Sequence, residues 1–157
     1  MGSNPTLSAM NHDQAMRLAL TEARAAVEHE DVPVGALVIV GDEVGSSRHN
    51  ERQLTGDPTA HAEILALRDA ANQLGTWCLD GATLVSTLEP CPMCAGAALN
   101  ARVAHVIFGA HDPKAGAVET LYNLLDDPRL NHQAKITSGV LAAECGDILS
   151  QFFAQRR

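Results

Sequence analysis

One histidine and two cysteines, carried by two short motifs, constrain this chain more than any other feature. His61-Ala62-Glu63 comes first, and Pro90-Cys91-Pro92-Met93-Cys94 follows, with Cys91 placed 28 positions after Glu63 (91 minus 63). An imidazole and two thiolates can hold Zn²⁺ and leave its fourth coordination position open, which is the arrangement of a catalytic rather than a structural zinc site. The fold must therefore bring the two motifs together, with the Glu63 carboxylate free beside them.

The spacing within each motif indicates how these residues meet. Cys91 and Cys94 are three positions apart, so on a helix they share one face and can bind the same ion. A helix start also carries partial positive charge, which favours thiolate over thiol. His61 and Glu63 are two apart, so both reach one site only if they lie in the first turn of a helix. We therefore expect two helix N-termini to converge on one zinc ion, with Glu63 as general acid and base.

Hydrophobic periodicity predicts strands that alternate with helices. Residues 46–59 read as a long polar loop, and Pro90 suits the first turn of a helix. In the terminal helix we expect Leu149, Phe152 and Phe153 to face inward. The predicted helices are 13–29, 60–74, 91–101, 119–125 and 141–157, and the predicted strands are 34–40, a second hairpin strand from 43 onward, 82–87, 105–108 and 134–137.

This alternation indicates one α/β domain with helices on both faces of a sheet. A chain of 157 residues is long enough to bury its own core, and no repeat or linker divides it. We expect residues 13–157 to form a single zinc-binding domain and residues 1–12 to form a flexible N-terminal segment. Met1-Gly2-Ser3-Asn4-Pro5 lacks the features of a signal peptide and fits a cloning remnant in part.

Composition narrows the partners and the compartment. The net charge of -8 argues against a general nucleic-acid coat protein, although it allows a local basic patch. No apolar stretch is long enough to cross a membrane. Four cysteines without an export signal predict a reducing, cytoplasmic location, with Cys78 and Cys145 as free thiols.

Other interpretations of the Cys-x-x-Cys motif remain open at this point. A Cys-Pro-Met-Cys segment between a strand and a helix also describes a thioredoxin-like redox pair, but the upstream His61 and Glu63 favour a metal. A closed structural zinc would need a fourth ligand, for which Cys78 or His105 could be proposed. A scaffold that keeps zinc for stability would have no need of the Glu63 carboxylate.

The residues around both motifs resemble those of the bacterial tRNA-specific adenosine deaminases, within the cytidine deaminase superfamily. The resemblance runs from about Asp13 to the C-terminus. It is carried by Asp57-Pro58-Thr59-Ala60-His61-Ala62-Glu63-Ile64, the segment from Thr87 to Ala97, Phe108-Gly109-Ala110, Asn131-His132 and the ending Phe152-Phe153-Ala154-Gln155-Arg156-Arg157. It implies a three-layer α/β/α cytidine-deaminase-like fold with a mixed sheet of about five strands.

The same resemblance implies a function: zinc-dependent hydrolysis of adenosine to inosine at the wobble position of a tRNA anticodon. His61, Cys91 and Cys94 would bind one Zn²⁺ per subunit, and Glu63 would transfer protons. The enzyme would act as a homodimer, and its partner would be the tRNA anticodon stem-loop. The residues that match substrate-contacting positions are Asn50, Asp112, Lys114, Asn131 and Arg156, while Pro33-Val34-Gly35 matches a pocket wall and Arg157 a further phosphate contact.

The main alternative substrate is a free nucleobase or nucleoside, above all guanine. The guanine deaminases share the Asp-Pro-Thr-Ala-His-Ala-Glu and Glu-Pro-Cys-Pro-Met-Cys segments, and Leu74-Gly75-Thr76-Trp77 also resembles them. The Phe108-Gly109-Ala110 and Asn131-His132 segments and the Phe-Phe-x-x-Arg-Arg ending fit the tRNA enzymes better. The sequence therefore favours tRNA over a small molecule as the substrate.

Overall fold

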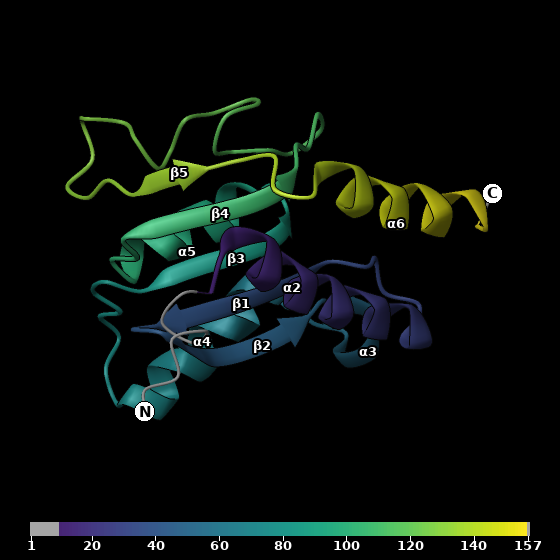
Figure 1. Cartoon of the computed structure of the whole chain (residues 1–157), viewed down its shortest axis with the longest axis horizontal. Coiled ribbons are helices and arrows are strands. Elements are labelled where there is room, and N and C mark those ends of the chain that lie inside the picture. The colour runs from purple at the N-terminus through teal and green to yellow at the C-terminus, as the bar shows by residue number, and fades with distance from the viewer. Residues whose placement is uncertain (1–9, 157) are drawn as a thin grey trace.

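A five-stranded mixed sheet forms the centre of the molecule (Figure 1). The structure, a computed structural model, describes residues 10–156. The strand order is β2-β1-β3-β4-β5, in which β1 pairs antiparallel with both β2 and β3, and the last three strands run parallel. The strands are β1 (Gly35–Val40), β2 (Glu43–His49), β3 (Thr83–Leu88), β4 (His105–Ala110) and β5 (Lys135–Thr137).

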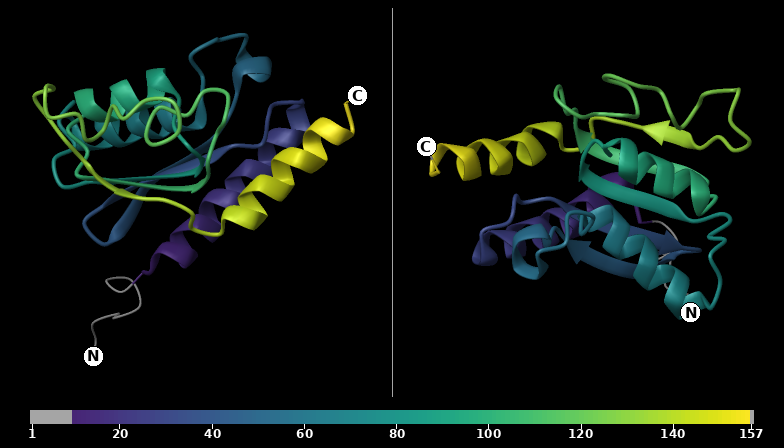
Figure 2. Two further views of the ribbon diagram at one scale, coloured as in Figure 1. Left: turned by 90° about the horizontal axis from the view of Figure 1, so that it is seen from above. Right: turned by 180° about the vertical axis from the view of Figure 1, so that it is seen from behind.

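Helices cover both faces of this sheet, which makes three layers. Seen from above, α2 and α6 lie side by side on one face, while α4 and α5 lie on the other (Figure 2). The helices are α2 (His12–Ala26), continued by the 3-10 turn η1 (Val27–His29), the short α3 (Arg52–Thr55), α4 (Ala62–Leu74), α5 (Pro92–Asn100) and α6 (Ala142–Ala154). The predicted α/β/α architecture is therefore confirmed.

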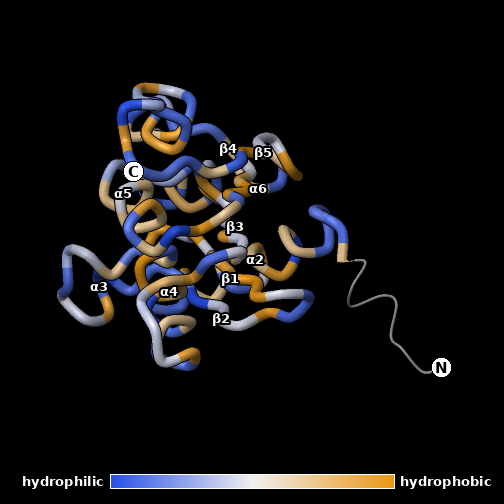
Figure 3. The backbone as a smooth tube through the Cα atoms, turned by 90° about the vertical axis from the view of Figure 1, so that its left-hand side faces the viewer, coloured by the Kyte–Doolittle hydropathy of each residue, from blue (hydrophilic) through white to orange (hydrophobic). Residues whose placement is uncertain are grey.

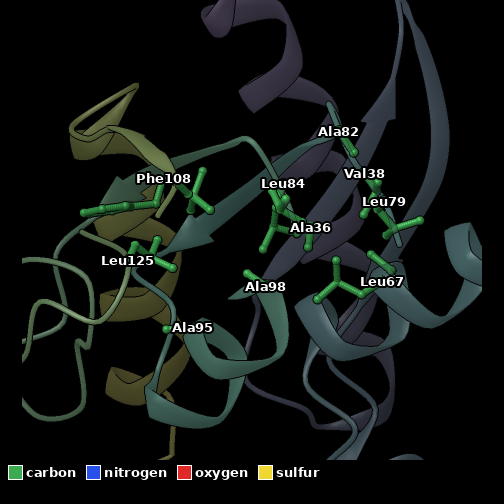
Figure 4. Close-up of a cluster of buried hydrophobic side chains, with 14 of the residues drawn as sticks. Ala36, Val38, Leu67, Leu79, Ala82, Leu84, Ala95, Ala98, Phe108 and Leu125 are labelled. Carbon is green, nitrogen blue, oxygen red and sulfur yellow. The ribbon is translucent and has the colours of Figure 1, made fainter. Parts of the chain in front are cut away.

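The alternation of side chains along the strands supplies one core to each face of the sheet. On β1, Ala36 and Val38 face α4 and α5, whereas Leu37 faces α2 and α6. The larger core, part of which Figure 4 shows, also takes in Phe108 and Leu125. In Figure 3 the hydrophilic segments lie mostly in peripheral loops, as burial of the apolar strands requires.

Gly35 brings α2 unusually close to the start of β1. A Cβ atom added at Gly35 would stand 1.9 Å from the backbone oxygen of Ala19 and 2.7 Å from the backbone nitrogen of Ala23. Only a residue without a side chain fits here. This contact holds α2 against β1, whose first residue directly follows Val34.

Most predicted elements appear within a few residues of their expected limits, although Pro90 precedes helix α5 and Pro92 occupies its first turn. The long loop expected over residues 46–59 is wrong at its start and in its middle, where β2 and α3 form, whereas residues 56–59 lie outside helices and strands as expected. Strand β2 continues to His49 through its pairing with β1, and α3 forms because the Asp31 carboxylate accepts the backbone N–H groups of Gln53 and Leu54, at 2.7 and 3.1 Å.

The predicted helix over residues 119–125 does not form. Turns occupy this region, since one carboxylate, that of Glu89, accepts three consecutive backbone N–H groups, those of Val118, Glu119 and Thr120. The inward placement of Phe153 is also wrong, because its side chain is 48% exposed while Phe152 is buried. The helix presents only one of two adjacent residues to the core.

The described residues bear on the expectations for the chain ends, the cysteines and membrane spans. The expected flexible segment falls mainly on residues 1–9, which lie outside the described range, as does Arg157. All four cysteines, each in the part of the chain that the structure describes, are free. Among residues 10–156, none of the helices combines the length and the apolar character needed to cross a membrane.

Candidate active site

The two motifs meet because each one starts a helix on the same face of the sheet. His61 is the N-terminal cap residue of α4, and Cys91 is that of α5, with Pro92 fixing the first turn of α5. Cys94 lies one turn further along α5 and is fully buried. The convergence of two helix N-termini, predicted from the spacing of the residues, is confirmed.

The three donor atoms stand at distances that suit a tetrahedral metal ion. The Nδ1 atom of His61 lies 3.5 Å from Sγ of Cys91 and 3.4 Å from Sγ of Cys94, and all three atoms lie within 4.8 Å of one another. A nitrogen and a sulfur that bind one tetrahedral Zn²⁺ are about 3.5 Å apart. Among the residues described, this is the one group of three or more histidine, cysteine or acidic side chains that could hold a metal ion.

Glu63 lies in the first turn of α4, beside these donors, and its side chain is only 4% exposed. Burial raises the pKa of Glu63 above that of an ordinary glutamate, and the nearby charge of His61 only partly offsets this effect. A carboxyl group with a raised pKa can both accept and release a proton near neutral pH. The arrangement therefore provides a proton-transfer group next to a metal site.

The electrostatics of the cysteines also suit a metal. A hydrogen bond from Cys94 lowers the pKa of Cys91 to about 4, against the opposing effect of burial. The same hydrogen bond and burial raise the pKa of Cys94. The hydrogen bond with Cys91 raises the pKa of His61. Binding of a metal ion by these residues would require His61 to be neutral and both cysteines to be thiolates, and would therefore depend on pH.

A cavity of about 210 Å³ opens onto these groups. Asn50, Arg52 and Asp112 provide polar groups at its wall. The remaining lining residues are Val32, Val34, His61, Ala62, Glu63, Leu88, Glu89, Cys91 and Ala115. A cavity that combines apolar side chains with converging polar groups is typical of a small-molecule binding site.

Glu89 fixes one side of this cavity. Its carboxylate is 1% exposed and accepts hydrogen bonds from the backbone N–H of Asp112 at 3.0 Å, from the three amides of residues 118–120 and from the Thr120 hydroxyl. Burial acts to raise the pKa of Glu89, but hydrogen bonds from Glu119, Thr120 and Asp112 outweigh it and lower the pKa to about 2. A permanently ionised carboxylate thus holds the loop after β4 against the site.

The residues expected to contact substrate are not all at the cavity. Asn50 and Asp112 line it, although the Asn50 amide already donates to the Val32 carbonyl at 3.2 Å. Lys114 borders a neighbouring hollow of about 570 Å³ between the loop after β4 and α6. Asn131 is exposed and does not line the cavity.

Arg156 lies at a second neighbouring hollow, of about 250 Å³, which shares Asn50 and Arg52 with the cavity. It pairs with Glu30, and its guanidinium stacks 3.6 Å from the centre of the Phe152 ring. The sequence alone does not point to Arg52 as a residue of the cavity wall. It also does not point to Asp31 and Glu89 as the residues that hold this wall in place. The only signal was the position of Glu89 directly before Pro90-Cys91.

Known proteins share this fold. A family model described as MafB19-like deaminase matches residues 10–157. A structure of a guanine deaminase from Nitrosomonas europaea is similar in fold, with a TM-score of 0.76 at 24% identity, over 98% of this chain and 94% of that one. An α/β/α fold with a His-Cys-Cys donor set beside a buried glutamate defines the class: this is a deaminase.

Two closer relatives place the chain within that class. The tRNA-specific adenosine deaminase of Bacillus subtilis is 51% identical over 142 residues, which cover 90% of this chain and 88% of that protein. A structure from work on tRNA:A34 deaminases, which edit A to I at the wobble position, has a TM-score of 0.83 at 42% identity and covers 86% of this chain and 98% of its own. The chain therefore belongs to the family of tRNA-specific adenosine deaminases.

Proposed function

We propose that this chain converts adenosine to inosine at the wobble position of a tRNA anticodon, with release of ammonia. The observation that carries the proposal is the buried Glu63 carboxylate beside three convergent metal donors in a cavity of about 210 Å³. The identity of 51% to a tRNA-specific adenosine deaminase supports the same reaction.

We further propose that His61, Cys91 and Cys94 hold one Zn²⁺ per chain. One imidazole nitrogen and two thiolates suit Zn²⁺, and the nitrogen–sulfur distances of 3.4 and 3.5 Å fit its tetrahedral geometry. When bound, Zn²⁺ supplies Lewis acidity that makes water available as a nucleophile near pH 7. Two thiolates and a neutral imidazole would balance the charge of a bound Zn²⁺ and would leave one coordination position for water.

The protein groups then have separate roles. Glu63 accepts a proton from the attacking water and passes it to the purine ring, then takes the proton of the newly added hydroxyl group and passes it to the departing amino group, as a general base and acid. Val32, Val34 and Leu88 exclude bulk water from the base. The side chain of Asn50, which is 6% exposed, would have to exchange its hydrogen bond with the Val32 carbonyl for one with the base.

A tRNA loop can reach this cavity only with the target base turned out of its stack. We propose that the flanking nucleotides lie along the two hollows beside the cavity, where Arg52, Lys114 and Arg156 supply positive charge. Asp112 and Asn131 would contact the anticodon loop from the same side. Because the chain carries a net charge of -8, phosphate binding must depend on these few residues.

The substrate class is tested with purified protein at one zinc per chain. The protein is incubated with an anticodon stem-loop RNA carrying adenosine at the wobble position, and separately with guanine, adenosine and cytidine. We expect inosine in the RNA and no ammonia from the free compounds. Ammonia from guanine without inosine in the RNA would contradict the proposal and favour a nucleobase deaminase.

We also propose that the chain acts as a homodimer in the cytoplasm. Exposed apolar side chains in the loop between β4 and β5, those of Leu121, Tyr122 and Leu130, offer surface for association. Light scattering across a range of concentrations should give twice the monomer mass. A monomer mass at all concentrations would contradict the dimer, and cell fractionation tests the location.

A further inference from the structure

Two histidines outside the active site place their ring nitrogens face to face. The Nε2 atoms of His29, in η1, and His49, the last residue of β2, are 3.1 Å apart. The ring centres are 5.1 Å apart and the ring planes differ by 31°. Both side chains are about one-fifth exposed, so the space between them is open to ions from solution.

Each of these rings has a carboxylate behind it. Nδ1 of His29 lies 2.7 Å from the carboxylate of Asp31, which is 1% exposed, and Nδ1 of His49 lies 2.9 Å from the carboxylate of Glu22. A ring that donates its Nδ1–H to a carboxylate presents an unprotonated Nε2 on the other side. If neither Nε2 carries a proton, the two lone pairs face each other and repel unless a cation lies between them.

We propose that His29 and His49 form a second metal site, for a first-row divalent transition-metal ion of the Zn²⁺, Ni²⁺ or Cu²⁺ type. Imidazole nitrogen suits these ions. Two nitrogens on one tetrahedral Zn²⁺ are about 3.3 Å apart, close to the separation seen here. A carboxylate on the outer nitrogen of each ligand is also the usual arrangement around metal-bound histidines, where it fixes the ring and raises its basicity.

The site is separate from the active site and does not depend on the proposed function. Among the described residues, no third histidine, cysteine or acidic donor converges on the pair, so water completes the coordination and the affinity is lower than that of the His-Cys-Cys group. The ion would join η1 to the end of β2. His49 directly precedes Asn50 and His29 lies three positions before Val32, and both Asn50 and Val32 line the cavity. The ion would thus hold these two segments of the cavity wall together.

The proposal is tested by titrating Zn²⁺ into protein that already holds one zinc per chain. Isothermal calorimetry should show one further ion per chain, bound more weakly than the first. Cu²⁺ added at one equivalent to the zinc-loaded protein should give an electron paramagnetic resonance spectrum with coupling to two imidazole nitrogens. A protein that takes up no second ion would overturn the proposal and show that the two rings share a proton only.

Matched variants locate the second ion. His29→Gln and His49→Gln should each abolish the second binding event, while Glu22→Gln, which removes only the outer carboxylate, should weaken it by about 10-fold or more. His12→Gln, at an exposed histidine of α2, is the control and should bind both ions. Retention of the first zinc and of the circular dichroism spectrum shows that each variant is folded. A second ion that persists in both histidine variants would also overturn the proposal.

Discussion

At the scale of single residues, Glu63 is the group that we propose for proton transfer. Glu63→Gln keeps the shape of the side chain but cannot accept a proton, so we expect kcat to fall by about 10² to 10⁴-fold. The zinc content should stay at one per chain, because Glu63 is not among the three donors. Single-turnover assays on the stem-loop RNA, with metal analysis of the same sample, measure both quantities.

Glu43→Gln is a suitable control for this change, since Glu43 is an exposed carboxylate in the turn region of the β1–β2 hairpin. It should leave kcat unchanged. If Glu63→Gln retained the full rate of deamination, the assignment of proton transfer to Glu63 would be wrong.

Glu89 has a structural role that depends on its charge. Its carboxylate accepts hydrogen bonds from the backbone N–H groups of residues 112 and 118–120. The side-chain NH₂ group of a glutamine cannot accept a hydrogen bond, so part of these bonds would be lost. We therefore expect Glu89→Gln to lower the free energy of unfolding by roughly 3 kcal/mol at pH 7, as a pKa lowered from 4.5 to about 2 implies. Urea unfolding measures this loss.

The pH dependence of the Glu89 effect has a definite sign. Because folding lowers the pKa of Glu89, the stabilisation is complete above the unfolded pKa of 4.5 and is lost as the pH falls toward about 2. The difference in urea midpoint between the native protein and Glu89→Gln should therefore narrow between pH 5 and pH 2. A difference that stays constant over this range would show that the ionised form is not what matters.

At the scale of elements, the contact between α2 and β1 leaves no room for a side chain at Gly35. In Gly35→Ala the new methyl group would stand 1.9 Å from the Ala19 carbonyl oxygen, so the helix must move away from the strand. We expect a loss of about 3 kcal/mol or more, or no folded protein. Gly146→Ala, in α6 with no atom near the added group, should instead stabilise by about 0.5 to 1 kcal/mol. Thermal unfolding of both variants checks the contrast.

Elements with their own periodic pattern could be predicted from the sequence, and elements held by distant side chains could not. Helix α4 follows from its apolar spacing and its stop at Gly75, which has a positive φ of 69°. Helix α3 depends on Asp31, more than twenty positions earlier. The false helix at 119–125 fails for the same reason, because Glu89 binds the amides that a helix would use.

The residues of the candidate site also fall into two groups, those that a local sequence pattern predicts and those that only the tertiary structure brings together. The donors and Glu63 could be predicted because two short motifs carry them. Arg52, Asp31 and Glu89 reach the wall only through the packing of separate segments, which no local pattern reveals. The substrate contacts at Asn50, Asp112, Lys114, Asn131 and Arg156 stay predictions.

At the scale of the whole molecule, the metal donors connect α4 to α5 across 33 positions of sequence, from His61 to Cys94. Metal bound to the folded form alone adds to the free energy of unfolding by mass action. We expect removal of zinc by a chelator to lower the melting temperature by several degrees, and added Zn²⁺ to restore it. Differential scanning calorimetry measures the change. The melting temperature of His61→Ala should change little when zinc is removed or added. A change as large as that of the unaltered protein would show that the stabilising ion binds elsewhere.

The long loop between β4 and β5, residues 111–134, contains no helix or strand and is held in part by hydrogen bonds to Glu89. Apart from the one donated by the Thr120 hydroxyl, those bonds use backbone N–H groups, which almost every amino acid provides. Side chains along the loop, such as Lys114 and Asn131, can therefore change over generations while the loop keeps its attachment. Substrate choice can diverge there without disturbing the metal donors or Glu63, which lie on other segments. Related enzymes can thus acquire new substrates through this loop while their chemistry stays the same.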